Sequence, residues 1–166
     1  MTEAEHVYKS QPYLTSASLP AAVARYLNGS DLLEKTQALR LSTVDAAGWP
    51  HAALLSAGDM VAMPSDRIRF VLFPQSSTTA NLVRDGRLTL TLALDGGMCE
   101  VKLRAHQLEH SSPEVPLAFF EAEVEAVRNH LAPYAAVTHG ITFALHEPQE
   151  VLPRWRRQIA ALRAVA

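Results

Sequence analysis

A two-residue alternation of apolar and polar side chains is the pattern that most restricts the fold of this chain. Between residues 88 and 94 every second side chain is a leucine, with threonine or alanine between them. The same period recurs in residues 38–44 and 98–109, where one face is apolar and the other is polar. Alternate side chains of a β-strand point to opposite faces of a sheet. The chain is therefore expected to form a sheet with a buried face.

Turn residues separate these segments at the spacing that hairpins require. Residues 45–48 read Asp-Ala-Ala-Gly and residues 95–97 read Asp-Gly-Gly, and glycine supplies the positive φ that tight hairpin turns use. The first turn predicts that residues 50–57 form a partner strand for residues 38–44. Residues 68–73 are also strand-like, and residues 58–67 are expected to form a loop or a short strand.

Helices are expected where the period changes. Residues 18–27 form one helix, beginning at Ser18 and Pro20, and residues 31–37 form a short helical turn. Ser76 or Ser77 caps a helix that runs to about Arg84. Three longer segments complete the expected elements: an amphipathic helix over 113–131, a last alternating strand over 137–145 and a final helix over 148–164.

These elements predict a mainly β (α+β) fold: a six-stranded antiparallel split β-barrel with peripheral helices. A length of 166 residues suits one domain, so residues 1–166 are expected to form a single split-barrel domain. Residues 1–17 are expected to be an N-terminal arm, and residues 148–166 are expected to carry the C-terminal helix.

Charge and composition exclude several classes of partner. The formal charge is −2, from 15 basic and 17 acidic residues, so no global field favours nucleic acid or an anionic membrane. The N-terminus lacks the basic and apolar regions of a signal sequence. Cys99 is the lone cysteine, which fits a reducing compartment, and the expected location is cytoplasmic.

Side chains that carry chemistry are scattered in the sequence. The seven histidines show no His-x-x-x-His or Cys-x-x-Cys spacing, so no metal site is expected. Cys99 lies on the apolar face of its strand and is interpreted as a small buried hydrophobe. No Gly-x-Ser-x-Gly motif surrounds Ser76 and Ser77, which disfavours a hydrolase nucleophile. The arginines between residues 154 and 163 are interpreted as a solvated helix end, with the binding of an anion as the alternative.

The order of motifs in residues 36–108 resembles the pyridoxamine 5'-phosphate oxidase-like split-barrel family. The segment ALRLSTVDAAGWPHAALLS contains the Asp-x-x-Gly-x-Pro-His turn between two strands. The segment RIRFVLFPQSSTTANLVRDGRLTLTLAL contains a strand, a Ser/Thr-rich turn, a helix with Asn-Leu and the Asp-x-Arg-aliphatic start of the next strand. The resemblance implies a homodimer that holds two flavin mononucleotides (FMN) in grooves between its subunits.

The resemblance also implies which residues contact the flavin. They are Ala53, Leu54, Leu55 and Ser56 on the strand after the Gly-x-Pro turn, Leu72 and Phe73 at the end of the next strand, Ser76, Ser77, Thr78 and Thr79 in the phosphate turn, Asn81 on the helix that follows, and Lys102 on the long strand. Lys102 is implied to reach across from the other subunit. Four hydroxyl groups beside a helix N-terminus suit an anion. For Ser76 and Ser77 a simple helix cap is the alternative, and Asn81 has the alternative of bracing its helix against the sheet.

Basic residues of the family pattern are missing at three positions. Ser77 and Thr78 stand where members of the family usually have arginine and lysine, and Ala53 stands where a basic residue is often found. Charge-assisted hydrogen bonds are each typically worth about 1.5–3 kcal/mol, so their loss weakens phosphate binding. The candidates to replace them are Arg40, Arg84, Lys102 and Arg104. The same scarcity of basic residues disfavours pyridoxamine phosphate as the substrate.

Three functions remain open at this stage. The first is an FMN-dependent oxidoreductase acting on a small-molecule substrate in the dimer groove, with no catalytic residue assigned. The second is a non-catalytic binding or sensing protein for flavin, heme or another planar ligand. The third is a barrel with an empty groove that acts by assembling with a partner.

Overall fold

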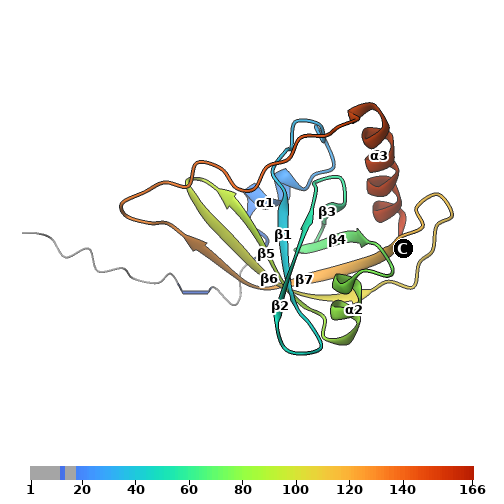
Figure 1. Ribbon diagram of the computed structural model, residues 1–166, viewed down its shortest axis with the longest axis horizontal. Coiled ribbons are helices and arrows are strands. Elements are labelled where there is room, and N and C mark those ends of the chain that lie inside the picture. The colour runs from blue at the N-terminus through green and yellow to red at the C-terminus, as the bar shows by residue number, and fades with distance from the viewer. Residues whose placement is uncertain (1–11, 14–17) are drawn as a thin grey trace, which may run out of the picture.

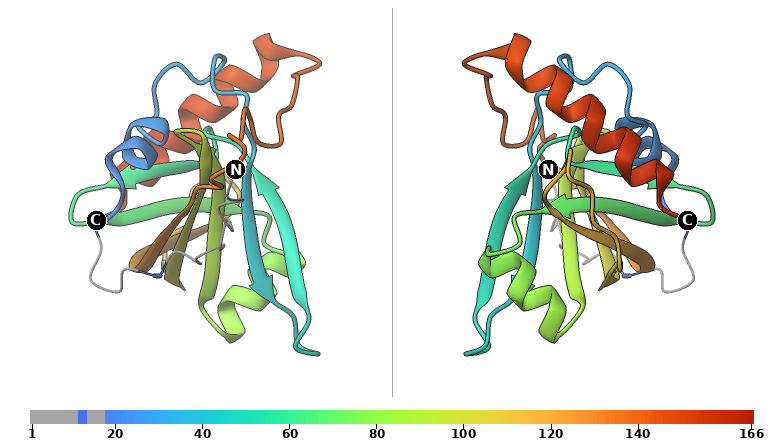
Figure 2. Two further views of the ribbon diagram at one scale, coloured as in Figure 1. Left: turned by 90° about the vertical axis from the view of Figure 1, so that its left-hand side faces the viewer. Right: turned by 90° about the vertical axis from the view of Figure 1, so that its right-hand side faces the viewer.

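One antiparallel sheet dominates the computed structural model, which describes residues 12–13 and 18–166 (Figure 1). The elements, in chain order, are α1 (Ala21–Tyr26), β1 (Leu39–Val44), β2 (Pro50–Leu55), β3 (Met60–Met63), β4 (Arg67–Leu72), α2 (Ser77–Arg84), β5 (Arg87–Leu94), β6 (Gly97–Gln107), β7 (Ala118–His130) and α3 (Pro148–Ala164). The strands have the order β2-β1-β5-β6-β7-β4-β3, so β2 and β3 are the edges. The sheet curls into a half-barrel (Figure 2). The mainly β split-barrel prediction is confirmed, with seven strands in place of six.

The predicted hairpins are present at both turns. Gly48 has a φ of +86°, and its N–H donates to the carbonyl of Asp45 at 3.0 Å. Strands β1 and β2 then pair so that Leu41 faces Ala53. The second turn lies between Leu94 and Gly97, which pair directly as the last residues of β5 and the first of β6. The expected N-terminal arm lies outside the described residues, apart from residues 12–13.

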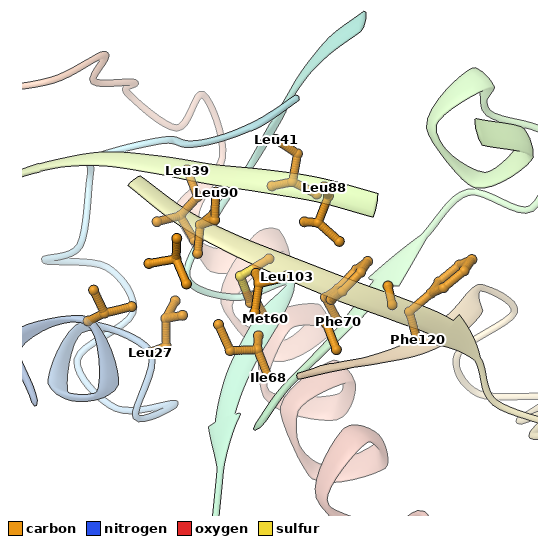
Figure 3. Close-up of a cluster of buried hydrophobic side chains, with 14 of the residues drawn as sticks. Leu27, Leu39, Leu41, Met60, Ile68, Phe70, Leu88, Leu90, Leu103 and Phe120 are labelled. Atoms are coloured by element: carbon orange, nitrogen blue, oxygen red, sulfur yellow. The ribbon is translucent and has the colours of Figure 1, made fainter. Parts of the chain in front are cut away.

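The curled sheet encloses one apolar core, and α3 covers a second on its outer surface. Alternate residues of the strands point inward, including Leu41, Phe70 and Leu90, which are fully buried (Figure 3). The residues between them on β3, β4 and β7 point outward, and Val71 and Phe119 pack there against the helix. Strands β4 and β7 are therefore buried on both faces at this end of the sheet.

The predicted helix over 113–131 is wrong, because this segment contains the long strand β7. Strand β7 pairs with β6, and a bulge at Glu125 shifts the register between the pairs Lys102–Ala126 and Leu103–Val124. Side chains facing the inner core therefore follow a spacing of two up to Val124 and then jump by three to Val127. Burial of Phe119 on the outer face removes the remaining alternation. Spacings of three and four in a strand with a bulge thus imitate a helical period.

The predicted strand over 137–145 is also wrong. Residues 131–147 form an extended segment that runs along the sheet to the start of α3 (Figure 1). It donates from the N–H of Val137 to Gly96, and the carbonyl of Ile141 accepts from Ala38 at 2.8 Å. Its pairing with the rest of the described chain is one isolated bridge, between Gln37 and Thr142, and a second bridge joins Ala132 to Ala135 within the segment, so no ladder forms. Because most of its side chains are exposed, alternation here does not mark a buried face.

The remaining helix predictions are largely confirmed. Helix α2 has Ser76 as its N-cap, and α3 begins at Pro148 as expected. Helix α1 is shorter than the expected segment 18–27, and residues 32–34 form a turn. No helix in the described part of the chain has the length and apolarity to cross a membrane.

Candidate functional site

A pocket of about 490 Å³ lies where β2, the end of β4, the start of α2, the loop before β7 and α3 meet. In the right-hand view of Figure 2, α3 crosses above the sheet and α2 lies below, beside β2. The residues that line the pocket are Ala53, Leu54, Leu55, Asp59, Val71, Leu72, Phe73, Ser76, Thr78, Glu114, Val115, Pro116, Leu117, Arg154, Arg157 and Gln158. Its volume lies within the range of roughly 300–1,000 Å³ that is usual for small-molecule sites.

Seven of the twelve predicted site residues line this one pocket. They are Ala53, Leu54, Leu55, Leu72, Phe73, Ser76 and Thr78. They come from two stretches of the sequence, β2 and the continuous stretch from the end of β4 into α2, which the curl of the sheet brings together. Whether they bind a cofactor stays a prediction.

One wall of the pocket is apolar and partly open to solvent. Leu54 is 53% exposed and Phe73 is 70% exposed, although both are large hydrophobic side chains. Leu54 lies on β2, an edge strand that pairs only with β1 among the described strands. Its outer backbone N–H and carbonyl groups therefore have no sheet partner. The wall combines apolar side chains with free backbone donors and acceptors.

The Ser/Thr-rich turn uses half of its hydroxyl groups to build the start of α2. The Ser76 hydroxyl accepts from the Thr79 N–H at 3.1 Å and donates to the Thr79 hydroxyl at 3.0 Å. The Thr79 hydroxyl in turn donates to the Phe73 carbonyl at 2.8 Å. This is the helix cap that formed the alternative interpretation of Ser76. Ser77 and Thr78 are left for a ligand, and of these two only Thr78 lines the pocket.

Three other predicted residues do not line the pocket themselves. The Asn81 side chain is buried and donates to the Thr43 hydroxyl at 3.0 Å, which braces α2 against β1. The Ser56 hydroxyl donates to the carboxylate of Asp59 at 2.8 Å. Lys102 places its Nζ 3.8 Å from the centre of the Tyr13 ring, on the polar face of β6.

The basic side chains at the pocket are Arg154 and Arg157, which sequence reasoning had assigned to a solvated helix end. Neither makes a hydrogen bond or ion pair with the part of the chain that the structure describes. Of the candidates proposed from the sequence to replace the missing basic residues, none lines the pocket. Arg104, for example, pairs with Glu125 at 2.6 Å. The apolar stripe of α3 was the sequence signal that could have placed these arginines next to the sheet, because both of them border the stripe.

Two sets of contacts fix α3 over the pocket. At the middle of the helix, the Gln158 side chain donates to the Gly58 carbonyl and to the Asp59 carboxylate, both at 2.9 Å. The Trp155 ring packs so closely on Gly58 that an added Cβ would overlap it. Glycine at this position is therefore required by close approach of the helix.

The end of α3 is held by a buried arginine of β4. Arg69 donates to the carbonyls of Leu162 and Val165 at 2.8 and 2.7 Å and to the carboxylate of Glu121 at 2.7 Å. Burial alone would raise the pKa of Glu121, but hydrogen bonds from Arg69 and Arg67 outweigh it and hold that pKa below its ordinary value. This ionised network ties the helix to the sheet.

The described residues contain no group of three or more histidine, cysteine, aspartate or glutamate side chains positioned to hold a metal. Cys99 is buried in the inner core, as its interpretation as a hydrophobe required. Burial and then the nearby charge of Glu100 raise the pKa of the Cys99 thiol to about 11, so the thiolate is scarce at neutral pH.

A curated relative decides the family. The uncharacterized protein YclD of Bacillus subtilis (strain 168) is 37% identical to this chain over 139 residues, which cover 82% of this chain and 90% of YclD. The chain belongs to the YclD family. No family model matches it.

Solved structures show that this YclD relative has the fold of the pyridoxamine 5'-phosphate oxidase-like split barrels. Group A Streptococcus HupZ aligns with a TM-score of 0.54 at 15% identity, over 72% of this chain and 99% of HupZ. A Lactobacillus delbrueckii protein with the name "putative pyridoxamine 5'-phosphate oxidase" aligns with a TM-score of 0.54 at 16% identity, over 72% and 98% of the two chains. At these identities the likeness concerns the fold.

Proposed function

We propose that the pocket binds FMN and that the protein is an FMN-dependent oxidoreductase acting on a small molecule. The observation that carries this proposal is the convergence of seven predicted flavin contacts, from residues 53–55 and 72–78, on one pocket of about 490 Å³. Bound FMN would supply hydride or electron transfer. The chain's own side chains would bind and orient the ring and exclude water from it.

The residues at the pocket fit a flavin. The isoalloxazine ring needs an apolar wall on its face, which Leu54, Leu72 and Phe73 offer. It also needs backbone donors and acceptors at its pyrimidine edge, and the outer side of β2 carries such groups without sheet partners. Ala53 has a small side chain that leaves space beside the backbone. A flat, amphipathic ring suits this combination.

The same lining residues favour flavin over heme. Heme iron is held by histidine, cysteine, methionine or tyrosine side chains. None of these residue types is among the residues that line the described pocket. The planar-ligand alternative therefore has less support here in its heme form than in its flavin form.

The proposal includes a homodimer in the cytoplasm. Leu54 and Phe73 leave large apolar surfaces at the pocket mouth, which a second subunit would cover. In such a dimer the partner would contribute Lys102 to the flavin groove, because this residue does not line the pocket of its own chain and its Nζ lies over the Tyr13 ring. A reducing compartment agrees with the single cysteine.

The purified protein tests the proposal directly. We expect a yellow protein with flavin absorbance, or a colourless one that quenches the fluorescence of added FMN. Ala53→Trp should weaken FMN binding at least tenfold because the indole would fill the pocket, whereas Ala52→Trp, at an exposed neighbouring residue outside the lining, should bind as the wild type does. Failure of the wild type to bind FMN, or unchanged binding by Ala53→Trp, would contradict the proposed site.

Two further measurements address the remaining parts. Oxidation of a reduced nicotinamide by the flavin-loaded protein is expected for an enzyme, and its absence under all donors would favour a carrier. Light scattering should give the mass of two chains, and a monomer would remove the two-subunit groove.

A further inference from the structure

Two arginines on α3 stand out because they line the pocket and their guanidinium groups form no ion pair with the described part of the chain. Arg154 and Arg157 are three residues apart, so they lie on neighbouring positions of one helix face. Both line the pocket, and neither has a hydrogen-bond or ion-pair partner within the described residues. Their orientation toward the pocket is set by Gln158, which is buried one position further and bonded to Gly58 and Asp59.

Seven other arginines bond their guanidinium groups internally, while Arg25, Arg40 and Arg156, which have no such partner within the described residues, lie outside the pocket lining. Those that pair with a carboxylate or donate to a carbonyl include Arg67, Arg69, Arg84, Arg87, Arg104, Arg128 and Arg163. A guanidinium at the rim of a pocket with no such partner keeps its five donors available. The pair on α3 is therefore able to take an anion that enters the pocket.

The two acidic side chains that line the pocket form no ion pair with Arg154 or Arg157. The Asp59 carboxylate accepts from the Ser56 N–H, the Ser56 hydroxyl and Gln158, which occupies both of its oxygens. Glu114 is exposed and lies on the loop that precedes β7. The described pocket lining thus holds two arginines and two carboxylates, and neither carboxylate forms an ion pair with Arg154 or Arg157, so both guanidinium groups keep their donors available for an anion.

We propose that Arg154 and Arg157 bind the phosphate monoester of FMN and make the protein select FMN over riboflavin. The inference rests on the proposed flavin function. The pair replaces the basic side chains that are missing at Ser77 and Thr78. It also supplies hydrogen-bond donors beside Thr78, because the hydroxyl groups of Ser76 and Thr79 are engaged in the helix cap. Arginine suits this role because its planar fork matches the oxygens of a phosphate in two parallel hydrogen bonds.

The experiment compares FMN with riboflavin, which has the same ring and no phosphate. Quenching of flavin fluorescence is titrated for the wild type, for Arg154→Gln/Arg157→Gln and for Arg25→Gln/Arg156→Gln. The last variant removes two charges from exposed arginines outside the pocket and is the matched control. The wild type should bind FMN more tightly than riboflavin. Added salt should weaken the binding of FMN but not the binding of riboflavin.

The two variants should then separate. Loss of the α3 pair should weaken FMN binding by about 10–100-fold, since a hydrogen bond to a charged group contributes about 1.5–3 kcal/mol. Riboflavin binding should change less than about twofold, because such a surface substitution leaves the ring's contacts in place. The control variant should match the wild type for both ligands.

Three results would overturn the inference. The first is equal FMN affinity in the pocket variant and the wild type. The second is an equal loss for FMN and riboflavin, which would mean that the arginines shape the pocket without contacting phosphate. The third is no binding of either flavin by the wild type, which removes the proposed function as well. Good riboflavin binding by every variant separates a failure of the arginine role from a failure of the flavin site.

Discussion

The two helices that border the pocket are held in place in different ways. Helix α2 follows β4 after a short turn, and its start is fixed by hydrogen bonds among Phe73, Ser76 and Thr79, which lie within six residues of one another. Helix α3 is fixed by Arg69, which reaches carbonyls 93 and 96 residues later in the chain. The α2 wall of the pocket is thus fixed by residues close together in the sequence, whereas the α3 wall depends on contacts between residues far apart in the sequence.

The difference separates structural roles from ligand-binding roles. The hydroxyl groups beside α2 are mostly consumed by its own cap, so they hold the helix more than they serve a ligand. Arg154 and Arg157 of α3 have no partner among the described residues, and Trp155, Gln158 and Arg69 hold the helix without them. A helix anchored by buried residues on one face leaves its neighbouring face available for a ligand.

The largest effect is expected from breaking the distant anchor. Arg69→Met leaves Glu121 short of a partner in a buried site and removes the contacts to the end of α3, so it should lower the free energy of unfolding by about 3–5 kcal/mol. Arg67 pairs with the same carboxylate from a more exposed position, and Arg67→Met should cost only about 0–1 kcal/mol. Urea denaturation measures both, and equal costs would contradict a special role for Arg69.

A smaller effect is expected at the close approach of α3 to the sheet. Gly58→Ala places a methyl group against the Trp155 ring, and such overpacking typically costs about 1–3 kcal/mol. Hydrogen exchange should show the loss of protection in α3. Gly48→Ala, whose added Cβ meets nothing within 4 Å, strains only its own turn and should leave the exchange of α3 unchanged. Unchanged α3 protection in Gly58→Ala would mean that the helix yields there without loss.

The smallest effect is expected at the local anchor. Ser76→Ala removes the N-cap of α2, which typically costs about 0.5–2 kcal/mol. Ser77→Ala, at an exposed hydroxyl outside the cap, should stay within about 0.5 kcal/mol of the wild type. Thermal unfolding of the two variants compares them, and a similar loss in both would show that the cap has been assigned to the wrong serine.

The same contrast explains how far the sequence could predict the structure. The turns at residues 45–48 and 95–97 and the cap at Ser76 were predictable because their causes lie within a few residues. Strand β7 was not, because burial on both faces and the bulge at Glu125 replaced the strand period by one that resembles a helix. Strand β7 takes the place of the wrongly predicted strand over 137–145, and the seventh strand is β3, in a segment that was expected to be a loop or a short strand. The fold class held.

The candidate site divides in the same way. Ala53, Leu72 and Thr78 line the pocket as predicted, since they belong to a run of strands and turns that resembles the family pattern. Arg154 and Arg157 were missed because their place depends on where α3 packs, which is set by Gly58 and Arg69 far earlier in the chain. Periodicity identified the buried stripe of α3 but not the surface that the stripe covers.

The bond between Arg69 and the end of α3 also sets an order of events during synthesis. At the usual rate of about 5–20 residues per second, the carbonyls of Leu162 and Val165 are made roughly 5–20 s after the arginine that they bind. Strands β4 and β7 can already pair during that interval, while the α3 wall of the pocket does not yet exist. The α3 wall of the pocket therefore cannot form before residue 165 has been made, and a ligand that depends on α3 can bind only after that point.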